Sequence, residues 1–588
     1  MERNAFLINK KIHQYILPGV LMTVAMQLGN VVDGMIVGNI LGPDAMAAIE
    51  ISMPVLLLLQ MPAMMLAMGG AAEAAVLLGK RNIREADGVF SGSLAAGAVL
   101  SLLFALLTPF LPGPLAMALS GNETLAALVE PYIAVNFGGI PILTLAIIFC
   151  YFMNADNHPQ LGSALFIIAN VVNLALDLVF LNVFKIGMAG SALATVIGYL
   201  TGMVTVAVYF RSRHRMLHLQ KPGKEALHYA GLAAKAGIPS AAFTLMSALK
   251  SVIINSAIVR VLGNDPMAVY SVCANAVLIA ELCVGGIIGL VQNIAGILYG
   301  ERDYYGIRAL CKKVLTYSYL AIAVLVLTFL AAPRFIAGLF GITGGDMMEM
   351  CSMALRIFAL SFPFYVYNKF LMSYYQTILK PSLSTVITVL QGFLVIVPLT
   401  LLGIFLWGLP GVCVMAVASE AVTILFSILY RLLGQRRGRF EAGVYMLPEV
   451  TEVQNLDCSV RNDLNEVIAF REKLFVFCEE NGITDRDAKI LGLAMEEIAA
   501  NIVQYGYRAD QKNYMDISFT IQDDRYILRI RDDGIPFNPL EYTPDSSEHE
   551  DKVTLGGIAL LRKMMSDFQY MRVLNMNNTV AELQIVPK

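Results

Sequence analysis

Residues 161–181, LGSALFIIANVVNLALDLVFL, form an apolar stretch that is long enough to cross a lipid bilayer as a helix. The stretch contains one charged residue, Asp177, and a carboxylate inside hydrocarbon is costly unless it faces a polar cavity or a partner. Asn173 and Asn170 precede Asp177 by four and seven residues, which places both amides on the same helix face. We interpret Asp177 as a pore-facing acid on a surface that can hold a cation. The alternative is an acid that only caps or packs against a neighbouring helix.

The composition indicates a membrane protein with a soluble part. The 588 residues are 57% hydrophobic and 15% charged, with a mean hydropathy of +0.65, which is too apolar for a soluble globular chain. Residues 448–588 carry a net charge of −10 and the preceding residues carry +7, so two different parts meet near residue 447. No basic run is interleaved with aromatic residues and the pI is about 6.1, which disfavours nucleic-acid binding.

Apolar runs of spanning length recur through the first 433 residues and predict an all-α membrane part with twelve transmembrane helices. The runs are 14–40, 49–79, 88–111, 126–153, 159–183, 187–210, 231–262, 267–299, 308–333, 347–378, 381–406 and 410–433.

The loop charges predict the orientation of these helices. Lysine and arginine cluster in alternate loops, at 80–84, 211–224 and 302–313, whereas the loops at 41–46 and 112–125 contain neither residue type. Because basic loops stay in the cytoplasm, we expect a multi-pass protein of the cytoplasmic (inner) membrane, surrounded by membrane lipid, with both termini cytoplasmic.

A long-range repeat divides the membrane part into two halves. Matching residues lie 221 positions apart: Pro18 and Pro239, Gly42 and Gly263, Asp44 and Asp265, Gly79 and Gly300, Gly187 and Gly408, Gly190 and Gly411. Each copy holds six helices, an even number, so the two lobes should enter the membrane in the same direction and be related by an axis along the membrane normal. We therefore predict an N-terminal lobe at 1–220, a C-terminal lobe at 221–440 and a central transport site.

The acids depart from this repeat. The positions 221 residues after Asp33 and Asp177 are Ile254 and Pro398, so only the N-terminal lobe keeps both carboxylates. Two neighbouring carboxylates raise each other's proton affinity and can exchange a proton for Na⁺ or for a cationic substrate. The alternative is that Asp33 only marks the mouth of the first helix. The predicted ion-coupling set is Asp33, Asn173, Asp177 and Thr195, whose hydroxyl completes an oxygen cluster.

Several motifs resemble the multidrug and toxic compound extrusion (MATE) family over residues 1 to about 440. They are VVDGMIVGNILGPDAMAA at 31–48, the NxxNLxLD-type segment at 170–177, KIGMAGSALAT at 185–195 and GIPSA at 237–241. The resemblance implies an antiporter driven by H⁺ or Na⁺ that exports cationic and amphiphilic small molecules. It also implies that Asp33, Asn173, Asp177 and Thr195 lie at the family's N-lobe cation site, while C-lobe acids used in another branch are not evident here.

After a linker at 441–449, residues 450–588 have the length of one domain and a mixed helix and strand pattern. Alternating stretches at 515–522, 525–532 and 579–586 predict strands, and helical spacing at 461–481, 485–507 and 558–568 predicts helices. We therefore expect a cytoplasmic α/β sandwich.

Two motifs in this domain suggest nucleotide chemistry. In EEIAANIVQYGY, Glu497 and Asn501 lie one helical turn apart, so an amide oxygen can bind Mg²⁺ while the carboxylate accepts a proton from a nucleophile. In RDDGIPFNP, Asp532 follows a strand and can accept from the amino group of adenine, and Gly534 lets the ring approach the backbone. Each motif alone is unremarkable, since an ExxxN helix is more often a solvated face.

A third motif, TLGGIALLRK, places Gly556 and Gly557 where a helix opens, and free N–H groups there suit phosphate. Together the three motifs resemble the histidine-kinase-like ATPase fold, in particular the anti-sigma-factor serine kinases, across 450–588. The resemblance implies ATP with Mg²⁺ as cofactor, Glu497 as catalytic base, Asn501 on Mg²⁺, Asp532 on adenine and a lid at 541–555. Where that family commonly has G-x-G, this chain has Leu555-Gly556-Gly557.

Three functional hypotheses follow from the sequence. The first is an ion-coupled exporter with a regulatory nucleotide-binding domain. The second is a signalling protein in which the membrane lobes sense a ligand and the tail phosphorylates or sequesters an anti-sigma antagonist-type protein. The third is a degenerate tail that serves only for protein contacts.

Overall fold

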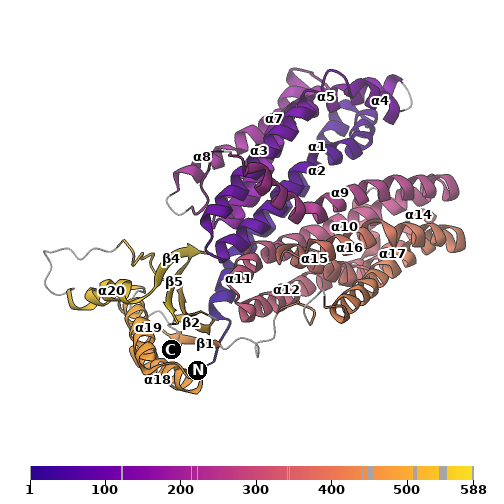
Figure 1. The fold of residues 1–588 in the computed structure, drawn as a ribbon. Helices are drawn as coiled ribbons and strands as arrows, with labels where there is room; N and C mark the ends of the chain where they lie inside the picture. The colour runs from indigo at the N-terminus through magenta and orange to yellow at the C-terminus, as the bar shows by residue number, and fades with distance from the viewer. Residues whose placement is uncertain are drawn as a thin grey trace. The chain divides into compact units, whose positions relative to one another are not determined.

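The computed structural model in Figure 1 describes most of the chain and separates it into two compact units. The membrane unit comprises residues 14–303 and 310–440, and the second unit comprises 1–13, 304–309 and 441–588. The described ranges are 2–120, 123–212, 215–221, 223–340, 342, 345–438, 443–447, 455–507, 513–522, 524–541 and 552–585, without the side chains of 26, 28, 30–35, 38, 43, 46, 47, 264 and 552–556.

The helices of the N-terminal lobe are apolar around most of their surface, as expected for segments that contact either lipid or one another. They are drawn in indigo to magenta in Figure 1. Their bounds are α1 (Phe6–Leu41), α2 (Pro43–Gly79), α3 (Ile83–Ala105), α4 (Pro112–Ser120), α5 (Glu123–Ala155), α6 (Pro159–Leu178), the π-helical turn η1 (Val179–Val183), α7 (Met188–Gly202) and α8 (Val204–Arg211).

The helices of the C-terminal lobe follow in the same order along the chain, with more breaks. Their bounds are α9 (Ala226–Leu262), α10 (Asn264–Leu290), η2 (Val291–Ala295), α11 (Gly296–Gly300), α12 (Tyr304–Ala331), α13 (Pro333–Leu339), α14 (Gly345–Ala359), α15 (Phe362–Thr377), α16 (Pro381–Val389), η3 (Leu390–Leu394) and α17 (Ile396–Arg436).

Within the described residues, nine helical segments are long and apolar enough to cross a membrane, or ten if the bent pair α14 and α15 is one span. The segment Pro381–Arg436 contains two of the runs expected from the sequence, divided by non-helical backbone at Gly408. The first expected run lies in α1. The structure therefore agrees with the predicted helical membrane fold, although it joins runs that the sequence analysis kept apart.

The backbone confirms the internal repeat. Residues with left-handed backbone, which side chains other than glycine seldom adopt, occur at matching places in the two lobes. The pairs are Gly42 and Gly263, Arg81 and Arg302, Asn157 and Leu379, and Gly187 and Gly408. Because three of these pairs are 221 residues apart and one is 222 apart, the two lobes share their turns as well as their sequence pattern.

The two lobes meet through glycines at the end that holds the basic loops. A β-carbon on Gly79 of α2 would lie 2.1 Å from the carbonyl oxygen of Ile297, and one on Gly300 would lie 2.1 Å from the carbonyl oxygen of Val76. Gly79 and Gly300 are equivalent in the repeat, so the contact pairs each lobe with its own counterpart. Small residues allow helix backbones to approach this closely in membranes, and we infer that they close this end of the bundle.

We predict that Gly79→Ala opens this contact. The added methyl group must displace the backbone around Ile297, so the distance between spin labels placed at Lys80 and Arg302 should increase. Gly138→Ala is the matched control, because a β-carbon on Gly138 of α5 meets no atom within 4 Å. An unchanged distance in Gly79→Ala would contradict the role given to this contact.

The second unit contains an antiparallel five-stranded sheet with the order β1-β2-β3-β5-β4. Three helices accompany the sheet, and their apolar side chains form one core with Met515, Ile517 and Phe519. The bounds are β1 (Asn455–Arg461), α18 (Leu464–Glu480), α19 (Asp485–Tyr505), β2 (Tyr514–Ile521), β3 (Arg525–Asp532), α20 (Lys552–Met564), β4 (Asp567–Val573) and β5 (Met576–Gln584).

The expected α/β fold is confirmed, with two differences. Arg461 ends β1 and Asp463 caps α18 by accepting from the amide of Asn465 at 2.8 Å, so the predicted helix at 461–481 began too early. Phe568 belongs to β4 and not to the end of the predicted helix at 558–568. Both errors have one cause, because β1 and β4 are short strands of mixed polarity with no clear alternation.

Candidate functional site

In the N-terminal lobe, α6 and α7 bring three of the four predicted coupling residues into one polar region. The amide nitrogen Nδ2 of Asn173 donates to Oγ1 of Thr195 at 3.1 Å, and Thr195 in turn donates to the carbonyl oxygen of Ser191 at 3.3 Å. The side chain of Asp177, one turn after Asn173, is fully enclosed, and Asn173 is 7% exposed. α6 and α7 can approach closely here because Gly198 lies against the carbonyl of Ala169.

The remaining polar residue of this face, Asn170, joins α6 to α1. Its Nδ2 donates to the carbonyl oxygen of Ala25 at 2.9 Å, and its Oδ1 lies where a β-carbon on Gly29 would be. The sequence assigned Asn170 to the cation face, whereas the structure uses its amide as a contact between helices. Asp33 lies in α1 one turn after Gly29, and its side chain is outside the described residues.

The C-terminal lobe holds its acids differently. Oε1 of Glu281 on α10 lies 3.0 Å from Nζ of Lys369 on α15, and Tyr365 donates to the other oxygen of Glu281. Glu420 on α17 accepts from the side-chain amides of Asn368 at 2.7 Å and Gln391 at 2.9 Å. These acids therefore make contacts within their own lobe, and the partners could not be assigned from sequence.

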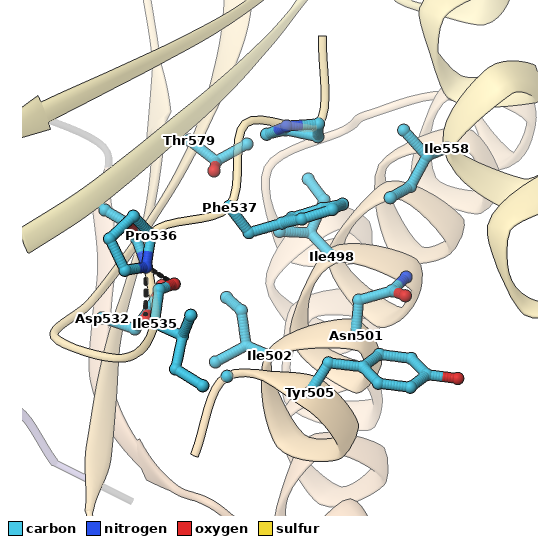
Figure 2. A pocket seen from close by; sticks show the side chains of 13 residues that line it. Ile498, Asn501, Ile502, Tyr505, Asp532, Ile535, Pro536, Phe537, Ile558 and Thr579 are labelled. Carbon is cyan, nitrogen blue, oxygen red and sulfur yellow. Dashed lines mark hydrogen bonds between the residues drawn. The ribbon is translucent and has the colours of Figure 1, made fainter. Parts of the chain in front are cut away.

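The second unit contains a cavity of about 330 Å³ between α19, the loop after β3 and the strand β5. Figure 2 shows Asn501 and Tyr505 of α19 on one side and Asp532 and Pro536 on the other. Most of the lining is apolar, which suits a flat ring, and the polar groups are few. The lining residues are Ile498, Asn501, Ile502, Tyr505, Gly506, Asp532, Ile535, Pro536, Phe537, Pro539, Ile558, Asn577 and Thr579.

Asp532 is 1% exposed at the inner wall of this cavity. Its Oδ1 accepts from the amide of Gly534 at 2.8 Å and from Nδ2 of Asn577 at 2.9 Å. Both hydrogen bonds that the described residues make to this carboxyl fall on Oδ1, so Oδ2 remains available to a ligand donor such as an exocyclic amino group. Burial raises the pKa of Asp532 to about 6, while the two hydrogen bonds oppose the shift.

Asn501 carries a buried side-chain acceptor on the wall of this cavity. Its Nδ2 donates to the carbonyl of Glu497 at 2.6 Å, whereas its Oδ1 has no hydrogen-bond partner among the described residues. Buried polar atoms are normally satisfied, so an orphaned amide oxygen on a cavity wall fits a role as ligand of a hard cation such as Mg²⁺. The residues present therefore fit the nucleotide and metal expected from the sequence.

Glu497 lies against the first turns of α20. A β-carbon on Gly557 would be 2.0 Å from Oε2 of Glu497, so only glycine leaves room for the carboxylate. Burial, followed by the neighbouring Glu496 carboxylate, raises the pKa of Glu497, as a proton acceptor near neutral pH requires. Glu497 and Gly557 are not among the cavity-lining residues, and the side-chain position at Gly556 is outside the described part.

Two features of this site differ from the sequence interpretation. A β-carbon on Gly534 would meet the carbonyl oxygen of Gly506 at 2.3 Å, so packing inside the domain, and not access for a ring, requires glycine there. Asn577 and Thr579 also line the cavity, and the sequence analysis missed them. Their signal was weak, because a single Asn-Asn-Thr run at a strand start resembles ordinary turn residues.

Two repeated lobes of apolar helices and a separate antiparallel α/β domain define a multi-pass membrane protein with a soluble domain attached. The MatE family model matches residues 18–179 and 239–402, more than half of the chain. The chain therefore belongs to the MATE family. A model of the histidine kinase-like ATPase domain matches residues 460–584, which cover β2 to β5, the end of β1 and all three helices of this domain.

Individual relatives agree with the family model. "Multidrug export protein MepA" of Staphylococcus saprophyticus is 21% identical over 388 residues, which cover 65% of this chain and 84% of that protein. "FAD transporter" of Shewanella oneidensis is 23% identical over 414 residues, 67% of this chain and 88% of that protein. A solved structure described as the outward-facing conformation of a multidrug resistance MATE family transporter has a TM-score of 0.66 at 19% identity and covers 73% of this chain and 96% of that one.

We predict that adenine-nucleotide binding to the intact protein weakens several-fold as the pH falls below about 6. The ionised carboxyl of Asp532 accepts a hydrogen bond from the ligand, and protonation weakens this acceptor. Nucleotide affinity should therefore be highest above the pKa of Asp532 and decrease below it. Titration of a fluorescent ATP analogue between pH 5 and 8 measures the effect. Protonation of the nucleotide phosphates lowers affinity equally in the wild type and in Asp532→Asn. The variant should therefore show only this common decrease, without the additional decrease that protonation of Asp532 causes in the wild type. Identical pH profiles would contradict the assignment of Asp532.

Proposed function

We propose that this protein is a cation-coupled antiporter of the cytoplasmic membrane that exports cationic or amphiphilic small molecules. The family relationship supports transport, and the relative named as a multidrug export protein supports this substrate class. Asp33, Asn173, Asp177 and Thr195 form the proposed coupling site, where a proton or Na⁺ is exchanged for substrate. The close glycine contacts at the basic end support a conformation in which the site opens toward the opposite side.

The observation that carries this proposal is the enclosed carboxyl of Asp177 beside the hydrogen-bonded pair Asn173 and Thr195. Burial of a carboxylate among membrane helices is costly, and this favours uptake of a proton or a metal ion at Asp177. In the C-terminal lobe, Pro398 occupies the repeated position, Lys369 neutralises Glu281, and two side-chain amides hold Glu420. We therefore assign ion coupling to the N-terminal lobe.

We predict that Asp177→Asn reduces export of a cationic dye from proteoliposomes to the level of vesicles without protein. The substitution keeps the side-chain volume and removes the exchangeable charge, so folding should persist while coupling is lost. Asp44→Asn, at an exposed acid in the first turn of α2, is the matched control and should transport normally. Normal efflux by Asp177→Asn in correctly folded protein would refute the proposed site.

We further propose that the C-terminal domain binds ATP with Mg²⁺ and regulates transport without driving it. The support is the cavity with Asp532 at one end and the unpartnered amide oxygen of Asn501 at the other. When bound, the metal would neutralise phosphate charge. Asn501 would hold the metal, Asp532 would orient the base, and Gly556 and Gly557 would lie at the phosphate end.

A second candidate function is signalling, and the position of Glu497 against Gly557 is the observation that favours it. A carboxylate with a raised pKa can accept the proton of a serine hydroxyl on a partner such as an anti-sigma antagonist-type protein. In this case the full chain should phosphorylate the partner's serine, and Glu497→Gln should abolish phosphorylation but retain ATP binding. Dye efflux with no phosphoryl transfer in the wild-type protein would rule this candidate out.

A further inference from the structure

The first residues of the chain belong to the same compact unit as the ATPase-like domain, more than 440 residues away in sequence. We call residues 2–13 the N-terminal arm. Its beginning lies along β1, an edge strand of the sheet. The amide of Asn4 donates to Oγ of Ser459 at 3.0 Å, and the amide of Ser459 donates to the carbonyl of Glu2 at 3.4 Å. The arm therefore covers backbone groups that an edge strand leaves exposed.

Side chains fix this contact. Nη2 of Arg3 lies 2.9 Å from Oδ2 of Asp516 on β2, and both side chains are at most 5% exposed. The rings of Phe6 and Tyr514 lie 5.0 Å apart between centroids. Breaking this buried ion pair would leave an uncompensated charge inside the domain. The ion pair and the aromatic contact therefore hold the arm in one position on the sheet.

The other end of the arm contacts residues that are sequence neighbours of the cavity lining. Lys10 forms an ion pair with Asp533, whose side chain is 2% exposed, and Nζ of Lys11 donates to the carbonyl oxygen of Asn575 at 3.2 Å. Lys11 is itself 2% exposed, and this burial lowers its pKa to about 8, although the Asp533 carboxylate opposes the shift. Two cationic side chains are thus held against acidic and carbonyl groups of the domain.

The residues that bind the arm are close neighbours of those that line the cavity. Asp533 directly follows Asp532, and Asn575 lies two residues before Asn577, whose Nδ2 donates to Oδ1 of Asp532. The segments 532–533 and 575–577 therefore each contact the arm through one residue and line the cavity through another. A ligand that fixes Asp532 and Asn577 must also affect the groups that hold Lys10 and Lys11.

We propose that the N-terminal arm is a resident partner of the ATPase-like domain and that nucleotide in the adjacent cavity strengthens its docking; this rests on the nucleotide binding proposed above. The sign follows from charge, because Lys10 and Lys11 place positive charge near Asp532, whose ionised carboxyl is the proposed acceptor for an adenine amino group. Such coupling is reciprocal, so docking of the arm also tightens nucleotide binding. Residues 6–13 of the arm form the first turns of α1, which also carries Asp33, so occupancy of the cavity can act on the helix of the proposed coupling site.

The test uses the full-length protein in lipid nanodiscs with Mg²⁺ and a fluorescent ATP analogue. Replacement of both lysines, Lys10→Ala with Lys11→Ala, should weaken nucleotide binding about fivefold or more, the lower end of coupling between linked sites. Hydrogen–deuterium exchange of residues 2–13 should slow in wild-type protein when nucleotide is added, and this change should disappear in the variant. Lys312→Ala with Lys313→Ala, an adjacent lysine pair on α12, is the matched control and should behave as wild type.

Two further variants guard against a folding defect. Lys10→Arg with Lys11→Arg should retain most of the nucleotide affinity, and Asp533→Asn should loosen the arm from the domain side. Wild-type nucleotide affinity in the alanine pair, or exchange of the arm that ignores nucleotide, would overturn the coupling while leaving nucleotide binding intact. Failure of the wild-type protein to bind the analogue would overturn both proposals.

Discussion

The side chain of Asp177 is fully enclosed among membrane helices, where a carboxylate is costly unless polar groups or a bound ion compensate its charge. Asp177 follows Asn173 by one turn of α6, and Asn173 is tied to Thr195 of α7. α6 and α7 lie close enough for this hydrogen bond because Gly198 of α7 has no side chain and packs directly against the backbone of α6. At the equivalent position of the repeat, the C-terminal lobe has Pro398 in place of Asp177.

The duplication explains why the two lobes can divide their roles. Their turns are the same, as the shared left-handed positions demonstrate, while their polar interiors differ. Where the N-terminal lobe encloses Asp177, the C-terminal lobe pairs Glu281 with Lys369 and holds Glu420 through two side-chain amides. The equivalent glycines Gly79 and Gly300 then let the two lobes approach at one end. In the proposed exchange cycle, the N-terminal lobe binds the ion and this glycine contact opens and closes.

The sequence was sufficient for features that depend on local pattern. Apolar runs, the 221-residue spacing and a lone acid at Asp177 are visible without coordinates, because each reflects a short-range or periodic constraint. The ion pair of Glu281 and Lys369 was not predictable, since its partners are 88 residues apart and packing alone brings them together. The contacts of the N-terminal arm with Ser459 and Asp533 join residues that are even farther apart in the sequence, so they were not predictable either. In the soluble domain the nucleotide motifs were found, but Asn577 and Thr579 had no distinctive pattern.

The central claim is that ion exchange, and not nucleotide, drives export. It is tested most directly in proteoliposomes that contain the full-length protein, with an imposed gradient of either H⁺ or Na⁺ and no nucleotide. A gradient of one of these ions should drive uphill movement of a cationic dye, and collapsing that gradient should stop it. Dye movement that ignores both gradients and requires ATP hydrolysis would contradict the account.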